Sequence, residues 1–324
     1  MKKGISIALV VSSVIVVLLF ISLMIGTGPE PDPYPDTTRE EAIPDDAVKM
    51  TPETDLYPPI LHLDLWYDPI PLEGLINTAG AEDSAFITPD GRSLLFFFTP
   101  DPGVPPEEQL LDEVTGIWCS TWNDTAWSEP VRIWLQEPGK LALDGAPFVL
   151  GTTMWFASAR EGFTGVNLFT ATHTGTWTDW TYAGDLLNKD YQAGEMHINR
   201  NGTEMYFHSG RSGGEGQYDI WVTRFINGAW AEPENLDVVN SPENEGWPFL
   251  SRNGTELWFT RTYLGSPSIW RSLWTDGSWG EPVLVLSSFA AEPTMDRDGN
   301  LYFIHHYVVD WELIEADVYV AYRK

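Results

Sequence analysis

Cysteine is almost absent from this sequence, and basic residues are scarce. Cys119 is the single cysteine, so the chain forms no intramolecular disulfide. Lysine and arginine number 18 against 47 aspartates and glutamates, which gives a formal net charge of −29 at pH 7. A surface of this charge repels nucleic acid and anionic lipid, so we predict no nucleic-acid partner.

Motifs that would indicate a nucleophilic serine, a cofactor or a metal are missing too. The sequence has no G-x-S-x-G, no phosphate-binding loop and no dinucleotide-binding fingerprint. His305 and His306 have no cysteine or carboxylate at zinc spacing, and neighbours on a strand point to opposite faces. We therefore predict no cofactor and no metal site.

Helical periodicity is also lacking along most of the chain, and a repeat of about fifty residues takes its place. The stretch INGAWAEP at 226–233 is nearly copied as TDGSWGEP at 275–282. Each copy is a tight-turn signal followed by a Trp, an acidic residue and a proline. Five such units, one of which has lost the proline, are centred on Trp66, Trp127, Trp177, Trp230 and Trp279.

One repeat can be written out as four strands. EGWPFLSRNGTELWFTR, from 245 to 261, carries two alternating runs joined by Asn253-Gly254, a strong hairpin signal. A run around Ile269 supplies a third strand, Asp276-Gly277 turns the chain, and residues 279–286 supply the fourth. Short antiparallel strands repeated in this way predict the blades of an all-β propeller, here with five four-stranded blades over residues 60–324.

The order of the motifs predicts how this ring closes. The first Trp unit, at Trp66, precedes every aromatic-pair strand, and the last blade ends at Lys324 without a Trp unit. The N-terminal segment is therefore expected to supply the outer strand of the last blade. Sharing one blade between the two chain ends removes exposed sheet edges.

These residues resemble the TolB-type, WD-like β-propeller repeats. The resemblance is carried by residues 245–259, by YFHSGRSGGEGQYDIW at 206–221 and by WAEPENL at 230–236, and it extends over about 60–324. It implies the propeller fold. Such repeats occur in periplasmic, secreted and surface proteins that mostly bind other proteins or ligands, although a fold does not determine a function.

The N-terminal part is predicted to lie outside the propeller. Lys2 and Lys3 precede 21 uncharged residues from Ile5 to Ile25, long enough for a single transmembrane helix. Residues 1–26 are therefore interpreted as a membrane anchor, with a cleaved signal peptide as the alternative. The flanking charges place the rest of the chain outside the cytoplasm, at the cell surface or in the periplasm. Residues 27–59, with eight prolines and nine acidic residues, are expected to form a disordered linker.

Candidate site residues come from the starts of the innermost strands, which line the channel of a propeller. Glu82 and Glu245 precede their turns by eight residues, and Glu195 and Glu292 by six. Because residues two apart on a strand face the same way, all four carboxylates are expected to point toward the axis, joined by Asp144. Trp247 occupies the position equivalent to Glu195.

Two interpretations of this acidic ring stay open. Each carboxylate can cap backbone N–H groups or pair with an arginine such as Arg160 or Arg211, which is a structural role. Alternatively, crowded carboxylates raise one another's pKa values and can hold a cation or perform acid and base catalysis.

The predicted function is a membrane-anchored, extracytoplasmic binding or scaffold propeller with no catalytic residues. Its partner would be a protein or a carbohydrate on the acidic-ring face. That face shares its side with the long loop 99–116, where Leu110 and Leu111 are candidate contacts. The alternative is a carbohydrate-active enzyme resembling a glycoside hydrolase, with the channel carboxylates as its acid, base and nucleophile and Trp247 as a sugar-stacking surface.

Overall fold

The computed structural model describes residues 34–188 and 194–324. The chain divides into two compact units, 1–36 and 37–324, and the fold described below is that of the second unit. The expected membrane anchor lies outside the described residues. Among the helices that are described, none has the length and apolar character needed to cross a membrane.

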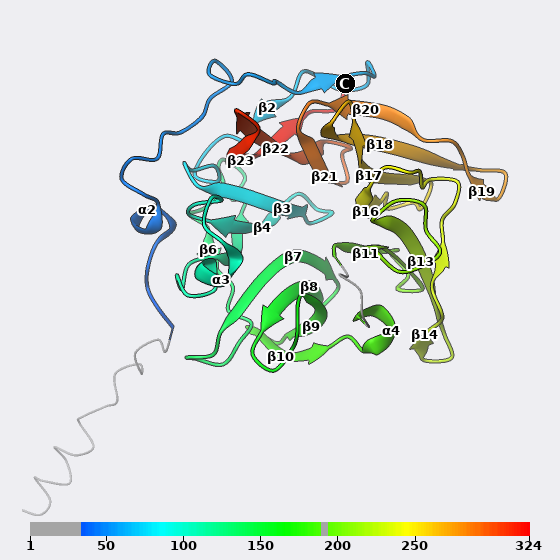
Figure 1. The fold of residues 1–324 in the computed structure, drawn as a ribbon, viewed down its shortest axis with the longest axis horizontal. Helices are drawn as coiled ribbons and strands as arrows, with labels where there is room; N and C mark the ends of the chain where they lie inside the picture. Colours follow the sequence, from blue (N-terminus) through cyan, green and yellow to red (C-terminus); the bar gives the residue numbers. More distant parts are fainter. Residues whose placement is uncertain (1–33, 189–193) are drawn as a thin grey trace, which may run out of the picture. The chain divides into compact units, whose positions relative to one another are not determined.

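Residues 60–324 form antiparallel β-sheets arranged around a centre (Figure 1). The inner strands are β3 (Ala81–Ile87), β7 (Ala142–Leu150), β11 (Met196–Ile198), β16 (Glu245–Leu250) and β21 (Ala290–Met295). The second strands are β4 (Ser93–Thr99), β8 (Thr153–Arg160), β12 (Glu204–Ser209), β17 (Glu256–Tyr263) and β22 (Leu301–Val309). The third strands are β5 (Gly116–Thr121), β9 (Asn167–His173), β13 (Asp219–Ile226), β18 (Ser266–Thr275) and β23 (Glu312–Ala321).

The outer strands complete these sheets. They are β6 (Val131–Arg132), β10 (Trp177–Tyr182), β15 (Glu234–Asn235), β20 (Val283–Ser287) and β2 (Ile70–Pro71). Two short strands, β14 (Ala229–Trp230) and β19 (Ser278–Trp279), pair with the ends of β13 and β18, and β1 (Ile60–Leu61) pairs with β20. Each of the helices α2 (Arg39–Ala42), α3 (Pro106–Gln109) and α4 (Asp185–Asn188) is a single turn.

The inner strands contact one another in order around the ring, β3 with β7, β7 with β11, β11 with β16, β16 with β21 and β21 with β3. Aromatic side chains fill the space between the sheets. At one equivalent position in each second strand a phenylalanine is completely buried: Phe96, Phe156, Phe207, Phe259 and Phe303. Burying such a side chain contributes about 1.5–3 kcal/mol, so these equivalent positions anchor every sheet to its neighbours.

The strand pairing at the closure agrees with the predicted one. Ile70 and Pro71 of β2 pair antiparallel with Val320 and Tyr319 of β23, the last long strand. Proline has no N–H to donate, so Pro71 suits an outermost strand. A single parallel pair between Ala316 of β23 and Ala81 of β3 also joins the last sheet to the first.

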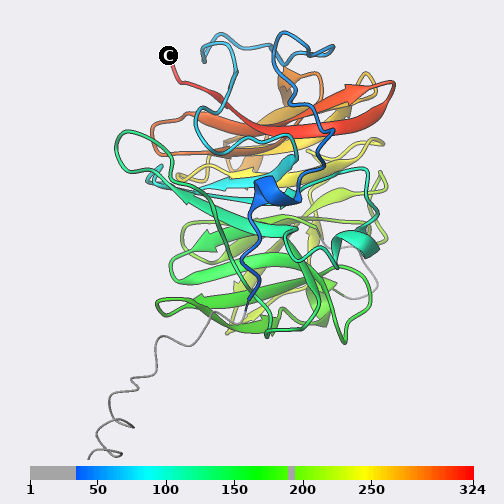
Figure 2. The same cartoon turned by 90° about the vertical axis from the view of Figure 1, so that its left-hand side faces the viewer.

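Residues 37–59, which we name the N-terminal strap, differ from the expected disordered linker. The strap lies against the sheets, with α2 beside the first sheet (Figures 1 and 2). Arg39 is only 1% exposed, Lys49 pairs with Glu315 and Asp317 of β23, and Asp55 lies 2.9 Å from His305. The prediction of disorder was wrong here because it weighed only the apolar surface that the segment could bury. Ion pairs hold the strap together with apolar contacts, in which Ile43 and Met50 pack against the core and Tyr57 lies against Phe289.

The contacts of the strap predict how truncation affects thermal stability. A chain that starts at residue 37 should melt at the temperature of the full-length protein. Starting at residue 60 removes Arg39, Lys49 and Asp55 and should lower that temperature, and starting at residue 81 also removes β2 and should cause aggregation. Thermal unfolding followed by circular dichroism checks this order. Equal melting of the chains starting at 37 and 60 would show that the strap adds no stability.

Candidate functional site

The acidic ring expected from the sequence separates into two groups. A β-bulge in the inner strands is the reason, because the pairing register shifts after Asp83, Gly145, Gly246 and Ala291. At each bulge one residue has a positive φ: Ser84 at 49°, Ala146 at 52°, Trp247 at 52° and Glu292 at 58°. A bulge breaks the two-residue alternation of a strand, so carboxylates on either side of it do not face the same way.

The first group consists of three carboxylates that are completely buried and paired with arginine. Glu82 lies 3.0 Å from Arg39, Asp144 lies 2.7 Å from Arg160, and Glu245 lies 2.6 Å from Arg261. Each carboxylate also accepts a hydrogen bond from a nearby hydroxyl group, that of Thr78, Ser158 or Ser241 respectively. The expectation that all five acids converge on the axis is therefore wrong for Glu82, Asp144 and Glu245, and the structural interpretation describes these three.

Arg39 has the role in the first sheet that Arg160 and Arg261 have in theirs. Arg160 stacks over Phe156 and Phe169 at 5.2 and 4.4 Å, and Arg261 stacks over Phe259 and Trp270 at 5.4 and 4.9 Å. Arg39 lies 5.3 Å from the rings of both Phe96 and Phe98. The first sheet has no arginine at the end of its second strand, and the strap supplies one.

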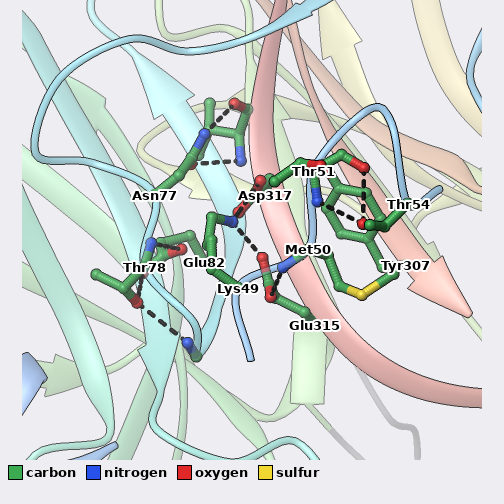
Figure 3. A network of polar contacts seen from close by, with 12 residues as sticks. Lys49, Met50, Thr51, Thr54, Asn77, Thr78, Glu82, Tyr307, Glu315 and Asp317 are labelled. Carbon is green, nitrogen blue, oxygen red and sulfur yellow. Dashed lines mark hydrogen bonds and ion pairs between the residues drawn. The ribbon is translucent and has the colours of Figure 1, made fainter. Parts of the chain in front are cut away.

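Burial controls the protonation of Glu82. Desolvation raises the pKa of Glu82 to about 8, although the Arg39 charge and the hydrogen bonds from Thr78 oppose that rise. Asp317, nearby on β23, adds to it. Figure 3 shows this region, with Lys49 donating hydrogen bonds to Glu315 and Asp317 and Thr78 donating to Glu82. The strap therefore supplies one cation to each of two neighbouring acidic positions, Arg39 to Glu82 and Lys49 to Glu315 and Asp317.

The second group lies at the axis and contains no arginine. The backbone N–H of Ser84 donates to Glu292 at 2.6 Å, and the Ser84 hydroxyl hydrogen-bonds to Glu195 at 2.6 Å. Asp83 joins this group, with His306 at 3.8 Å. Sequence reasoning missed Asp83 because a regular strand would turn it away from Glu82 and from the expected ring. The two different offsets of the acids before their turns were the available signal that the ring was not uniform.

The environment separates the pKa values of these axial carboxylates. Burial raises the pKa of Glu195 to about 8, against hydrogen bonds from Ser84 and Trp247. Burial, and then the charge of Asp83, raises the pKa of Glu292 well above its usual range. Burial acts against ionisation of Asp83 as well, but hydrogen bonding and the charge of His306 hold the pKa of Asp83 at about 2. At neutral pH the cluster therefore combines an ionised Asp83 with a protonated Glu195, a pair that can accept and donate a proton.

The space beside these carboxylates is small. Ser84, Glu195, Trp247 and Glu292 line a hollow of about 30 Å³, together with Phe148 and other side chains of the inner strands. On this measure about 10–15 Å³ is enough for one water molecule, so the hollow accepts water but no sugar ring. Across residues 34–188 and 194–324, no three His, Cys, Asp or Glu side chains are grouped so that they could hold a metal ion.

The candidate partner loop lies apart from the axial cluster in the sequence and contains α3. Leu111 is 61% exposed and Leu110 is partly buried. Asp112 accepts hydrogen bonds from the N–H groups of Val114 and Thr115, at 2.8 and 2.7 Å. The loop thus has a defined conformation with one exposed leucine.

Comparison with known proteins identifies the fold. No protein-family model matches the chain, and no curated protein matches its sequence. Among solved structures it is similar to an α-L-arabinofuranosidase from Lactobacillus brevis, with 13% identity, a TM-score of 0.50, and coverage of 77% of this chain and 92% of the other. A putative TolB from Agrobacterium tumefaciens has 15% identity and a TM-score of 0.45 and covers 73% of each chain. At 13% identity the similarity to the arabinofuranosidase concerns the fold alone, which is a β-propeller.

Proposed function

We propose that this protein is a five-bladed, TolB-type propeller that is held outside the cytoplasm by a membrane anchor in residues 1–26 and acts by binding a protein or a ligand. The observation that carries the binding role is the closed arrangement of the axial acids. Glu195 and Glu292 both bond to Ser84, around a space of about 30 Å³. Carboxylates that hydrolyse a glycosidic bond need an open gap of about 5–9.5 Å for the sugar and the water.

The blade count rests on the strand pairing. Each inner strand begins a meander of four antiparallel strands, and the last meander takes β2 from the N-terminal side. The TolB-type assignment rests on the recurring turn, aromatic pair and Trp unit. The anchor rests on the uncharged run from Ile5 to Ile25.

A hydrolase is the second candidate, and one observation favours it. Asp83 and Glu195 have pKa values of about 2 and about 8, and such a separation suits a base and an acid that act together. In this reading Glu195 protonates the leaving group, Asp83 activates water, and Trp247 stacks on the sugar after the channel mouth has widened.

A substrate screen decides between the two candidates. The full-length protein and its Asp83→Asn, Glu195→Gln and Glu245→Gln variants are incubated with arabinan, xylan and other polysaccharides, and released sugars are quantified. We expect no turnover by any of them. Hydrolysis by the parent that falls about 10²–10⁴-fold in both Asp83→Asn and Glu195→Gln, with their melting temperatures preserved, would establish the hydrolase instead. Glu245→Gln is the control for a purely structural carboxylate.

A further inference from the structure

A second hollow opens at the opposite end of the inner strands, on the side of the hairpin turns. We name it the turn-face cup. Its volume is about 200 Å³, several times that of the hollow beside the acids. Its wall is largely apolar and includes residues from every inner strand, among them Phe86, Phe148, Ile198, Phe249 and Met295. The cup is therefore centred on the propeller axis.

Three arginines surround the mouth of this cup. Arg200, Arg252 and Arg297 all line it, and all are exposed. They occupy the same position in three successive hairpin turns, Arg-Asn-Gly, Arg-Asn-Gly and Arg-Asp-Gly. In a chain with 18 basic and 47 acidic residues, three cations at one opening form an unusual concentration of positive charge.

Carboxylates nearby, those of Asp296 and Asp298, compensate part of this charge. Within the described parts of the chain, Arg200 and Arg252 form no ion pair, and Arg297 only approaches Asp298 at 3.9 Å. Asp296 also lines the cup, but its carboxylate accepts hydrogen bonds from the N–H groups of Asp298 and Asn300 at 2.9 and 3.0 Å. The guanidinium groups thus remain available to an anion.

The ring of His197 forms part of the wall of the cup. It lies between the rings of Phe148 and Phe249, with centroids 4.5 and 4.7 Å away. Burial lowers the pKa of His197 to about 3, so the ring is neutral at physiological pH and adds no charge to the cup.

We propose that the turn-face cup binds a small carboxylate with an apolar body, about as large as benzoate or hexanoate. The apolar body would occupy the space between Phe86, Phe148 and Phe249, and the carboxylate would face the arginines at the mouth. An apolar cavity of roughly 150 Å³ accepts benzene in another protein, so the volume here matches one ring with a polar substituent. Arginine binds carboxylates through paired, charge-assisted hydrogen bonds. This proposal rests on the proposed binding function and supplies it with a ligand class.

Titration calorimetry on the full-length protein tests the ligand class. Benzoate and hexanoate should bind with one site per chain. Acetate lacks the apolar body and benzylamine has the opposite charge, so both should bind at least about tenfold more weakly. Equal affinity for benzylamine and benzoate would overturn the proposal, as would the absence of saturable benzoate binding.

Variants at the mouth test the location. Arg252→Gln and Arg297→Gln should each weaken benzoate binding about five- to tenfold, and replacing all three arginines should abolish it. Arg92→Gln is the matched control, because Arg92 is an exposed arginine of the corresponding turn in the first sheet that pairs with Asp124 and does not line the cup. Benzoate affinity that is unchanged in the triple variant, or reduced equally by Arg92→Gln, would place the binding elsewhere.

The outcomes separate this proposal from the broader one. Hydrolysis that depends on Asp83 and Glu195 would contradict the binding role proposed for the protein. It would not affect a result that benzoate binds in the cup. Failure of benzoate and hexanoate to bind would remove the cup ligand, and the propeller would still be free to bind a protein through loop 99–116.

Discussion

The Arg39→Met variant should be less stable than the parent by about 3–5 kcal/mol, because it removes the hydrogen bonds that Arg39 donates to Glu82 and to two backbone oxygens. Arg39 is 1% exposed and Glu82 is completely buried. Arg39 also donates to the backbone oxygens of Leu75 and Ile76, at 2.6 and 2.8 Å, so the substitution leaves several buried acceptors without a donor. Urea unfolding at pH 7 measures the change.

Two further variants show whether this loss arises at the contact between Arg39 and Glu82. The double variant Arg39→Met/Glu82→Met should recover part of the lost stability, because it also removes the buried carboxyl group that Arg39→Met leaves without its donor. Arg92→Met breaks a pair whose arginine is 56% exposed, and should cost no more than about 1 kcal/mol. If Arg39→Met unfolded at the urea concentration of the parent, the strap would be only loosely attached and the ion pair would not matter.

Stability should fall as the pH rises from 6.5 to 8. The pKa of Glu195 is about 8 in the folded protein and 4.5 in the unfolded chain. Between these values the folded state holds a proton that the unfolded state has lost, so each pH unit costs up to about 1.4 kcal/mol for this group. Glu82 has a similarly raised pKa of about 8, and Glu315 one of about 7. A melting temperature lower by about 5 °C or more at pH 8 than at pH 6.5 is expected.

The chosen pH range excludes groups with the opposite effect. Burial lowers the pKa of His197 to about 3 and that of His208 to about 4, from 6.5, so these histidines destabilise the fold only as the pH falls below 6.5. The Asp83 carboxylate has a pKa of about 2, so its contribution to stability changes only as the pH falls below about 4.

Glutamine substitutions isolate the contribution of Glu195. Glu195→Gln imitates the protonated side chain and should flatten the dependence on pH, with stability at pH 8 equal to or above that of the parent. Glu243→Gln removes an exposed carboxylate and should leave the slope unchanged. A slope in Glu195→Gln as steep as in the parent would show that Glu195 is ionised throughout this range.

Local patterns were sufficient to predict most of the fold. The Asn-Gly and Asp-Gly turns, the aromatic pairs and the Trp units each act over a few residues, and they gave the strands and their order. Gly254, for example, has a φ of +73° in its hairpin turn, a conformation that glycine adopts without strain. The pairing of β2 with β23 followed from counting these units.

The errors arose where distant residues or irregular strands decide the structure. No local pattern shows that Arg39 reaches Glu82, although the first and the last sheets both lack an arginine like Arg160 or Arg261 after their second strands. The bulges at Ser84 and its equivalents are as hard to foresee, because the rule of alternating faces assumes a regular strand. That assumption placed Glu82 and Glu245 at the axis and left out Asp83.

The strap has a consequence for how the chain folds during synthesis. Lys49 and its partners Glu315 and Asp317 are 266 and 268 residues apart, so a segment made early in synthesis binds to one made late. Contacts over such separations form slowly, because the intervening loop must first be closed. Until β23 emerges, β2 and Lys49 lack their partners, and the edge of β3 stays open to other chains. A truncated or stalled product of this gene should therefore aggregate more readily than the finished protein.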